Sequence, residues 1–346
     1  MAYRAAVVGA SGYTGAELLR LLAAHPEIEV AHVTAESNAG ARVAELYPSL
    51  VAAYPELRYH PLEVPDLDGL DVAFVALPHG ESQRHAGALI SRVAHVVDLG
   101  ADFRLAQDSY EQWYGQPHQA PELLESFAYG LPELFRADLA ARPHVANPGC
   151  YPTAAILALA PLLAGGLVEP TGLIVDAASG VSGRGRGLSA PSLYSEANEN
   201  TAAYGLLTHR HTAEMELALG RLSPTGGAQV LFTPHLVPMT RGVLATCYAR
   251  PAATGLSTES LLAYYRDFYA GEPFVAVLAE SPSTKATLAG NAVHLTVRFD
   301  PRTGTVLAIA AEDNLVKGAS GQAVQNANLL LGLPETTGLS PVGVTP

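Results

Sequence analysis

The seven residues NPGCYPT, from Asn147 to Thr153, contain one of only two cysteines in the chain. Cys150 follows a Pro-Gly turn and precedes an Ala/Leu-rich apolar run that is typical of a helix, with Pro152 suited to its first turn. Unpaired backbone N–H groups and the positive end of the helix dipole both favour thiolate, the form that attacks carbonyl carbon. A lone cysteine is usually a small buried hydrophobe, but this placement favours a nucleophile.

A histidine pair lies in the block HRHTAE, at His209 and His211, with Glu214 one helical turn beyond His211. A histidine beside a thiol can transfer protons during acyl transfer, and a carboxylate can orient its ring. Two other interpretations stay open. One is a surface helix that Thr212 caps, and the other is a zinc site, which His-x-His without a further cluster supports only thinly. The pair is favoured as a proton carrier only together with Cys150, and no metal site is expected.

The start of the chain carries glycines at G-x-x-G-x-x-G spacing, at Gly9, Gly12 and Gly15. They stand between a predicted strand over 5–8 and a predicted helix over 16–24. In that setting the backbone can approach a pyrophosphate that faces the helix N-terminus. A glycine triplet alone is also compatible with an ordinary tight turn, but the strand–turn–helix context favours a dinucleotide site.

The choice of dinucleotide depends on residues after the second predicted strand. Glu36 lies near the place where NAD-binding folds put an acid for the ribose diol. Ser37, Asn38 and Arg42 could instead surround a 2′-phosphate. The local sequence leaves NAD and NADP undecided.

Two segments supply cations for an anionic ligand. Arg104 lies just past a predicted strand end, where α/β folds bind ligands and a guanidinium suits phosphate or carboxylate. The alternative is a surface ion pair with Asp102. The Gly-rich stretch SGVSGRGRG, at 179–187, is either a flexible loop or an anion-binding backbone nest near Arg184 and Arg186.

Composition restricts the class of protein. The 346-residue chain has room for two domains, and 20 Lys and Arg against 33 Asp and Glu give a net charge of −13. That charge argues against nucleic acid or an anionic membrane as partner. No apolar run reaches the length of a membrane span, the N-terminus lacks a signal-peptide layout, and two cysteines are no disulfide framework. We therefore expect a cytoplasmic protein.

The predicted elements indicate two architectures. Strands that alternate with helices before Cys150 predict an α/β Rossmann-type domain with a parallel sheet. Those strands are predicted over 5–8, 28–34, 71–77 and 95–99. After Cys150, segments that alternate apolar and polar residues, with a hairpin loop at Pro-Arg-Thr-Gly, predict an α+β domain with a largely antiparallel sheet.

The domain boundaries follow from these patterns. We expect residues 1–149 and 319–346 to form a discontinuous dinucleotide-binding domain. An amphipathic helix over 319–331 would return the chain to it. Residues 150–318 would form the catalytic and oligomerisation domain.

A dinucleotide fold, a nucleophilic cysteine and a histidine together indicate interconversion of an acyl phosphate and an aldehyde through a thioester, because covalent catalysis divides one difficult step into two. With these residues in place, the chain resembles the N-acetyl-gamma-glutamyl-phosphate reductase family of the semialdehyde dehydrogenase superfamily over nearly its whole length. The resemblance rests on nine blocks in the family's order: GASGYTG at 9–15, ALPHG at 76–80, DLGADFRL at 98–105, YGLPEL at 129–134, NPGCYPT at 147–153, SGVSGRGR at 179–186, HRHTAE at 209–214, FTPHLVPMTRG at 232–242 and EDNLVKGASGQAVQN at 312–326.

The resemblance implies NADPH-dependent reduction of N-acetyl-gamma-glutamyl phosphate to N-acetylglutamate 5-semialdehyde and phosphate, in arginine biosynthesis. It implies NADP(H) as cofactor, Cys150 as nucleophile through a thioester, and His211, in preference to His209, as the acid/base. It also implies a homodimer or homotetramer built through the second domain.

Further site residues follow from their positions in the blocks, and Ser37 follows from its place after the second predicted strand. Substrate contacts are expected from Arg104, Asn147, His209, Glu214, Arg186 and Lys317, the last facing the active-site cleft. Cofactor contacts are expected from Gly9, Ser11, Gly12, Tyr13, Thr14, Gly15, Ser37, Pro78, Ser182, Gly183 and Asn314, the last near the nicotinamide.

The chain departs from the family pattern at Arg184, where Ala is usual, and at Gly100, where Ser is common. The first departure bears on substrate or cofactor contacts, and the second is expected to be minor. Lysine-pathway relatives act on a carrier-linked aminoadipyl phosphate and lack the Pro-Gly-Cys-Tyr-Pro form, and an acidic carrier would be better served by a basic docking face. A Cys-His hydrolase would leave the glycine loop unexplained. A non-enzymatic redox regulator would leave the HRH block and Arg104 without a use.

Overall fold

The computed structural model describes residues 2–344 and divides them into two compact units. The first contains residues 2–148 and 319–339, and the second contains 149–318 and 340–344. Residues 340–344 were expected in the first domain. They lie with the second because Asn291 N donates a hydrogen bond to Ser340 O (2.7 Å) and Val344 N donates one to Leu288 O (2.8 Å). Residues 1, 345 and 346 of the expected ranges lie outside the described residues.

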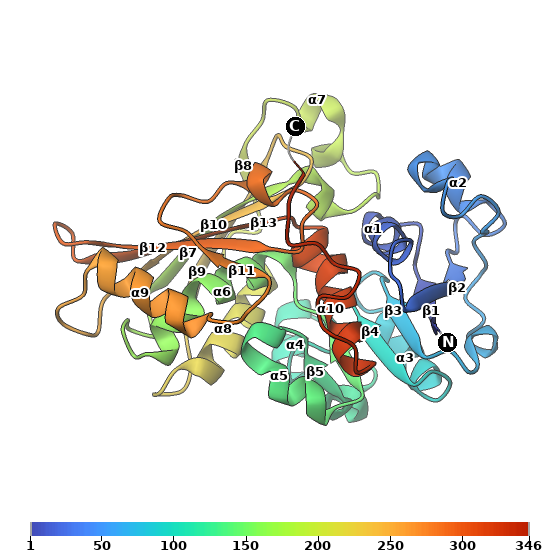
Figure 1. Ribbon diagram of the computed structural model, residues 1–346, viewed down its shortest axis with the longest axis horizontal. Helices are drawn as coiled ribbons and strands as arrows, with labels where there is room; N and C mark the ends of the chain where they lie inside the picture. Colours follow the sequence, from blue (N-terminus) through green and yellow to red (C-terminus); the bar gives the residue numbers. More distant parts are fainter. Residues whose placement is uncertain (1, 345–346) are drawn as a thin grey trace. The chain divides into compact units, whose positions relative to one another are not determined.

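The first unit is built on a six-stranded sheet with the order β2-β1-β3-β4-β6-β5, in which every neighbouring pair is parallel (Figure 1). Its strands are β1 (Tyr3–Val8), β2 (Ile28–Thr34), β3 (Val72–Val75), β4 (His95–Asp98), β5 (Phe127–Tyr129) and β6 (His144–Ala146). Its helices are α1 (Tyr13–Leu22), α2 (Val43–Leu46), α3 (Ser82–Ile90), α4 (Gln107–Tyr114), α5 (Pro132–Ala141) and α10 (Gly321–Leu330). The strand VAFV of β3 is buried at all four positions, as a parallel strand covered on both faces requires.

The helix α10 belongs to the first unit, although residues 149–318 of the second unit precede it in the sequence. It packs against α1, α5 and β4, and its residues 321–328 are buried. Just before it, the Ser320 hydroxyl donates to Thr14 O at 2.9 Å. The helix predicted over 319–331 begins two residues later, because the π-helical turn η7 (Val316–Ser320) precedes it.

The second unit is built on a seven-stranded mixed sheet with the order β11-β12-β13-β10-β7-β9-β8 (Figure 1). Its strands are β7 (Leu173–Gly180), β8 (Ala202–Ala203), β9 (Val230–Val237), β10 (Val243–Ala249), β11 (Val275–Val277), β12 (Val293–Asp300) and β13 (Thr305–Glu312). The predicted hairpin between β12 and β13 is confirmed. However, β7 pairs with β9 and β11 pairs with β12 in parallel, so a largely antiparallel sheet is not confirmed. A parallel pair needs a crossover connection, and the long segment between β7 and β9 supplies one.

Three helices pack on this sheet and on one another: α6 (Cys150–Ala164), α8 (His211–Leu222) and α9 (Thr258–Phe268). A short fourth helix is α7 (Tyr194–Ala197). The sequence of α6 is apolar almost all round, which is typical of a helix buried on every side, and its residues 151–163 are all buried. The buried body of α6 fixes the position of its first residue, Cys150.

Candidate functional site

The glycine loop joins β1 to α1 in the first unit. The helix begins at Tyr13, three residues earlier than the sequence indicates, and takes Gly15 into its first turn. That early start is possible because Gly15 has no side chain: a Cβ there would lie 2.5 Å from Ala10 Cα. A Cβ on Gly12, in contrast, would meet only one atom within 4 Å, at 3.8 Å. The backbone at Gly12 is therefore open to a ligand.

The first turn of α1 is open to an anion. No side chain among the described residues 2–344 caps the N-terminus of α1, and the first turn of the helix contains no acidic residue. Its N–H groups and the positive end of its dipole can therefore serve an anion. The predicted contacts Ser11 and Thr14 lie in this loop and turn, where the Ser11 carbonyl accepts a hydrogen bond from the Tyr47 hydroxyl at 2.8 Å.

The residues after β2 include the predicted contacts to the ribose diol or to a 2′-phosphate. Glu36 does not extend freely, because its Oε1 accepts a hydrogen bond from Leu62 N at 3.0 Å. Ser37 is exposed, and its hydroxyl accepts a hydrogen bond from Asn38 Nδ2 at 3.1 Å. Both side chains are exposed, and each has one hydrogen bond: backbone engages one carboxylate oxygen of Glu36, and Asn38 engages the Ser37 hydroxyl.

Two arginines, Arg42 and Arg58, follow Glu36 and Ser37 in the chain. Arg42 pairs with Glu45 at 2.8 Å and with Glu56 at 3.8 Å. Arg58, which no motif singled out, forms an isolated antiparallel bridge with Arg42 and donates to Gly40 O at 2.8 Å. Sequence reasoning missed Arg58, since its spacing from the glycine loop carries no signal.

The loop after β3 contains the predicted contact Pro78, which is exposed. The buried carboxylate of Asp102 accepts hydrogen bonds from Gly80 N, at 2.9 and 3.0 Å, and from Gln83 N at 3.2 Å. Asp102 therefore fixes the loop after β3 that contains Pro78. Because Asp102 is buried, it does not form the surface ion pair with Arg104 that was the alternative interpretation.

Arg104 and Asn147 lie together at the carboxyl ends of β4 and β6. The guanidinium of Arg104 donates to Asn147 O at 2.7 Å and to Leu99 O at 2.8 Å. The Asn147 amide donates to Ala319 O at 3.1 Å and accepts from Asn326 Nδ2 at 2.9 Å. Both side chains brace the backbone of this edge. Their contact with substrate stays a prediction.

A second buried acid, Asp98, ends β4. Its Oδ1 accepts hydrogen bonds from Ser82 Oγ at 2.8 Å and from Gly100 N at 2.9 Å. Burial, and after it the charge of Asp102, raise the pKa of Asp98 to about 7. A Cβ on Gly100 would lie 2.8 Å from Ser82 Oγ and 3.0 Å from Asp98 Oδ1, so glycine suits this arrangement.

In the second unit, Cys150 is the first residue of α6, with Gly149 as N-cap, which confirms the predicted helix start. Cys150 is partly buried. Cys247 of β10, in contrast, is fully buried, and burial raises the pKa of its thiol, which confirms that it belongs to the core. Of the two cysteines, Cys150 is the one with both access and a helix N-terminus.

The predicted histidines lie beside the cysteine's neighbour in the chain. The rings of His209 and His211 are 4.8 Å apart between centroids, and the Tyr151 ring is 5.8 Å from the first and 6.0 Å from the second. His211 begins α8, and its N–H donates to His209 Nδ1 at 3.3 Å. Thr212 therefore lies inside the helix and is not its cap. The fold thus brings the HRH block to the first turn of α6.

Two further groups hold the cysteine turn. Glu214, buried on α8, accepts a hydrogen bond from Gly149 N at 2.8 Å, so it secures the N-cap of α6. Gly318, in the turn η7, is close to the nucleophile: a Cβ there would lie 2.7 Å from Cys150 Cβ and 2.9 Å from Glu312 Oε1. The role of Gly318 was missed, because nothing in its block shows that it meets Cys150.

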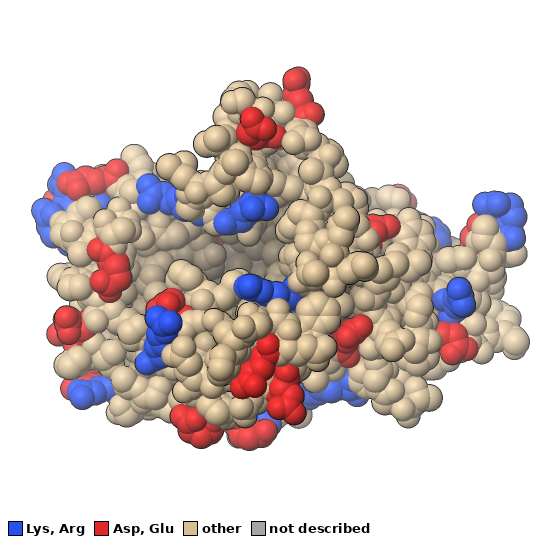
Figure 2. Space-filling view, turned by 180° about the vertical axis from the view of Figure 1, so that it is seen from behind, with Lys and Arg blue, Asp and Glu red and all other residues tan. Residues whose placement is uncertain are grey.

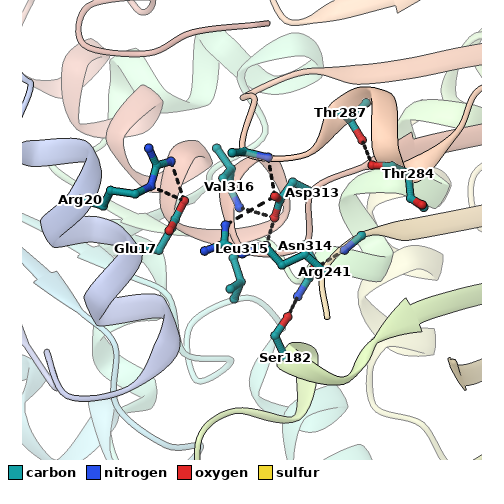
Figure 3. A network of polar contacts seen from close by, with 12 residues as sticks. Glu17, Arg20, Ser182, Arg241, Thr284, Thr287, Asp313, Asn314, Leu315 and Val316 are labelled. Atoms are coloured by element: carbon teal, nitrogen blue, oxygen red, sulfur yellow. Dashed lines mark hydrogen bonds and ion pairs between the residues drawn. The ribbon is translucent and has the colours of Figure 1, made fainter. Parts of the chain in front are cut away.

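The Gly-rich loop is fastened by Asn314. Its Oδ1 accepts a hydrogen bond from Gly242 N at 2.7 Å, and its Nδ2 donates to Ser182 Oγ at 3.0 Å (Figure 3). The adjacent Asp313 pairs with Arg241 at 3.5 Å. The predicted cofactor contacts Ser182 and Asn314 thus lie together, and Asn314 fixes the 3₁₀ turn η4 (Val181–Arg184) that contains Ser182 and Gly183.

The remaining predicted contacts differ in exposure. Arg186 is exposed in the loop after η4. Lys317 is fully buried, and its ammonium lies 5.6 Å from the centroid of the Phe274 ring. Substrate contact by Lys317 or Arg186 stays a prediction.

Within residues 2–344, no group of three or more His, Cys, Asp and Glu side chains could hold a metal ion. No helix in that range combines the length and apolar character that a membrane crossing requires. On the face seen in Figure 2, basic side chains are interspersed with acidic ones.

Both units match known domains. Residues 4–142 match the NAD-binding domain of semialdehyde dehydrogenases, and residues 150–314 match their dimerisation domain. Solved structures share the fold. Aspartate semialdehyde dehydrogenase II from Vibrio cholerae, complexed with ASA, is 17% identical with a TM-score of 0.71, over 96% of this chain and 99% of that one. Aspartate semialdehyde dehydrogenase with NADP from Candida albicans is 16% identical with a TM-score of 0.68, over the same shares. The chain is an oxidoreductase of the semialdehyde dehydrogenase class, and its cofactor is a nicotinamide dinucleotide.

Closer relatives narrow the class. A reductase from Desulforudis audaxviator is 52% identical over 98% of this chain and 99% of its own length. One from Pelotomaculum thermopropionicum is 48% identical over the full length of both. Each is named N-acetyl-gamma-glutamyl-phosphate reductase, and this chain belongs to the N-acetyl-gamma-glutamyl-phosphate reductase family.

Proposed function

We propose that the chain reduces N-acetyl-gamma-glutamyl phosphate to N-acetylglutamate 5-semialdehyde and phosphate, with NADPH as reductant, in arginine biosynthesis. The observation that carries this proposal is the place of Cys150 at the first residue of α6, where the next residue, Tyr151, lies against both rings of the histidine pair, in a member of this family. The matches to the NAD-binding domain and the dimerisation domain of semialdehyde dehydrogenases support the proposal.

The chain's own residues supply a covalent route. A histidine of the pair takes the thiol proton of Cys150, and the sulfur attacks the acyl carbon. The bond from carbon to phosphate oxygen breaks, phosphate leaves with the electron pair, and a thioester remains on Cys150. The glycine loop at Gly9, Gly12 and Gly15 would hold a nicotinamide dinucleotide, which would supply the hydride that reduces the thioester. The histidine returns its proton, the carbon–sulfur bond breaks, and the aldehyde leaves.

Within the histidine pair, we assign the proton to His211. Its position at the first residue of α8 fixes its backbone, while the ring lies beside both Tyr151 and His209. His209 then contacts substrate. The hydrogen bond that Gly149 N donates to Glu214 Oε1 supports this assignment indirectly, because it joins the start of α8 to the start of α6.

We assign NADPH, in preference to NADH, from the residues after β2. Leu62 N donates a hydrogen bond to Oε1 of Glu36, which engages one oxygen of the acid that a ribose diol would need, and the exposed Ser37 hydroxyl can donate to a 2′-phosphate. Turnover efficiencies with the two cofactors decide this. A preference for NADH that disappears in Glu36→Gln would mean that Glu36 binds the diol.

We also propose that the second unit forms a homodimer, alone or within a homotetramer. Ile174 pairs in register with Leu231 of β9 and Tyr248 of β10, and these side chains are 37%, 49% and 37% exposed. Such a row on a sheet face is suited to a second copy of the chain. Leu231→Asp should lower the mass measured by sedimentation, and an unchanged mass would place the interface elsewhere.

The test of the function is phosphate-dependent oxidation, run from the aldehyde side. The protein receives NADP⁺, inorganic phosphate and one of three aldehydes: N-acetylglutamate, aspartate or aminoadipate semialdehyde. We expect turnover with the first and little with the others. Preference for aminoadipate semialdehyde would favour a lysine pathway, and hydrolysis of a thioester without cofactor reduction would favour a hydrolase.

A further inference from the structure

Arg184 ends the turn η4 and is exposed. Its guanidinium carbon lies 5.7 Å from the centroid of the Tyr204 ring, a cation–π arrangement. Among residues 2–344, no carboxylate pairs with it. By comparison, Arg302, in the hairpin of the same unit, pairs with Asp300 at 3.3 Å. Arg184 is thus an uncompensated cation in a chain of net charge −13.

Tyr204 connects this cation to the nucleophile. Its hydroxyl donates to the Tyr151 hydroxyl at 3.1 Å, and Tyr151 is the residue after Cys150. Its ring also lies 5.5 Å from the ring of His209. Burial raises the pKa of Tyr204, whereas its hydrogen bond with Tyr151 and the charge of Arg184 lower it. Arg184 therefore contacts the phenol that is hydrogen-bonded to the neighbour of Cys150.

The backbone around Arg184 leaves room for a ligand. Gly185 has φ 79° and ψ −178°, a conformation that is open almost only to glycine. A Cβ on Gly185 or Gly187 would meet nothing within 4 Å. A guanidinium beside open backbone can bind a tetrahedral oxyanion through two parallel hydrogen bonds.

We propose that Arg184 binds the phosphate group of the acyl phosphate and holds it as it leaves. This inference rests on the proposed function, because the phosphate is that of the acyl phosphate which Cys150 attacks. When the carbon–oxygen bond breaks, the electron pair goes to the phosphate, and the guanidinium stabilises the charge that develops there. In the reverse direction Arg184 holds inorganic phosphate in place to attack the thioester carbon.

The experiment measures the KM for inorganic phosphate in the oxidation of N-acetylglutamate 5-semialdehyde. Arg184→Ala should raise this KM roughly tenfold or more, the scale of losing a charge-assisted hydrogen bond. Arg184→Lys keeps the charge without the planar fork and should give an intermediate value. Arg302→Ala removes a charge of the same sign from the same unit and should leave the KM unchanged. The KM values for NADP⁺ and the aldehyde should stay within about twofold.

Three results would overturn the inference. The KM for phosphate could be unchanged in Arg184→Ala, the KM for NADP⁺ could rise in its place, or Arg302→Ala could have an equal effect. Absence of any phosphate-dependent turnover in the natural protein would instead overturn the proposed function. In that case, calorimetric titration with inorganic phosphate still tests the anion site, because it should show weaker binding in Arg184→Ala. Equal binding by both proteins would refute it.

Discussion

Gly318→Ala tests whether the nucleophile depends on the close approach of the turn η7. The added Cβ would lie 2.7 Å from Cys150 Cβ and 2.9 Å from Glu312 Oε1. Since carbon atoms pack at about 3.5–4.0 Å, residue 318 or the start of α6 must shift by about 1 Å. Overpacking of this kind lowers the free energy of unfolding by about 1–3 kcal/mol. A 1 Å displacement of a reacting group lowers turnover about 100-fold.

Two measurements separate the local effect from a general loss of stability. Steady-state kinetics gives kcat/KM, and the rate of alkylation by iodoacetamide reports on Cys150, because Cys247 is fully buried. The matched control is Gly87→Ala in α3, where the added Cβ would meet only Leu123 Cδ1, at 3.9 Å. We expect the control to keep both values. If Gly318→Ala also keeps both, the contact has no bearing on Cys150 and the reasoning is refuted.

Three further predictions concern named side chains. Cys150→Ser should abolish reduction and keep NADPH binding, because a hydroxyl is a far poorer nucleophile than a thiolate; intact-mass trapping should place the acyl adduct on Cys150, and an adduct on Cys247 would be contrary. His211→Asn should lower turnover about 100-fold or more, while His209→Asn should act on substrate affinity; the reverse behaviour would assign the proton to His209. Asp98, with its pKa raised to about 7 by burial, binds its proton more tightly in the folded protein than in the unfolded chain. Between about pH 4 and pH 7 the natural protein should therefore lose up to about 4 kcal/mol of stability relative to Asp98→Asn. Urea unfolding at pH 5 and pH 8 measures the difference in the free energy of unfolding between the two proteins. A difference that is the same at both pH values would contradict the prediction.

Local patterns predicted those parts of the fold that local physics decides. The helix that starts at Cys150 followed from the Pro-Gly turn and the apolar run after it. The strand from Ile28 to Thr34 appeared at its expected bounds. In the second sheet, alternation showed which residues share a face, but a period of two is the same for parallel and antiparallel neighbours. The parallel pairing of β7 with β9 depends on the crossover between them, which alternation does not reveal.

Contacts between segments that are distant in the sequence could not be predicted for a related reason. Gly318 lies beside Cys150, although most of the second unit separates them in the sequence. Neither of the two sequence blocks indicates that it contacts the other. Asp102 appeared in the sequence only as a neighbour of Arg104, although its carboxylate binds the backbone of Gly80. Side chains such as these satisfy backbone groups that become available only when the chain has folded.

The path of the chain through the second unit has a consequence for its modularity. The longer segment of the unit begins at Gly149 and ends at Gly318, and residues 340–344 join it later in the chain. The two ends of the longer segment meet where a Cβ on Gly318 would lie 3.2 Å from Cys150 Cα. A segment whose ends touch has the layout of an insertion, which a host can gain, lose or exchange with little strain. Residues 149–318 would carry the nucleophile and both histidines with them in such an exchange. The reactive chemistry would then be a transferable module, and the host would keep the glycine loop.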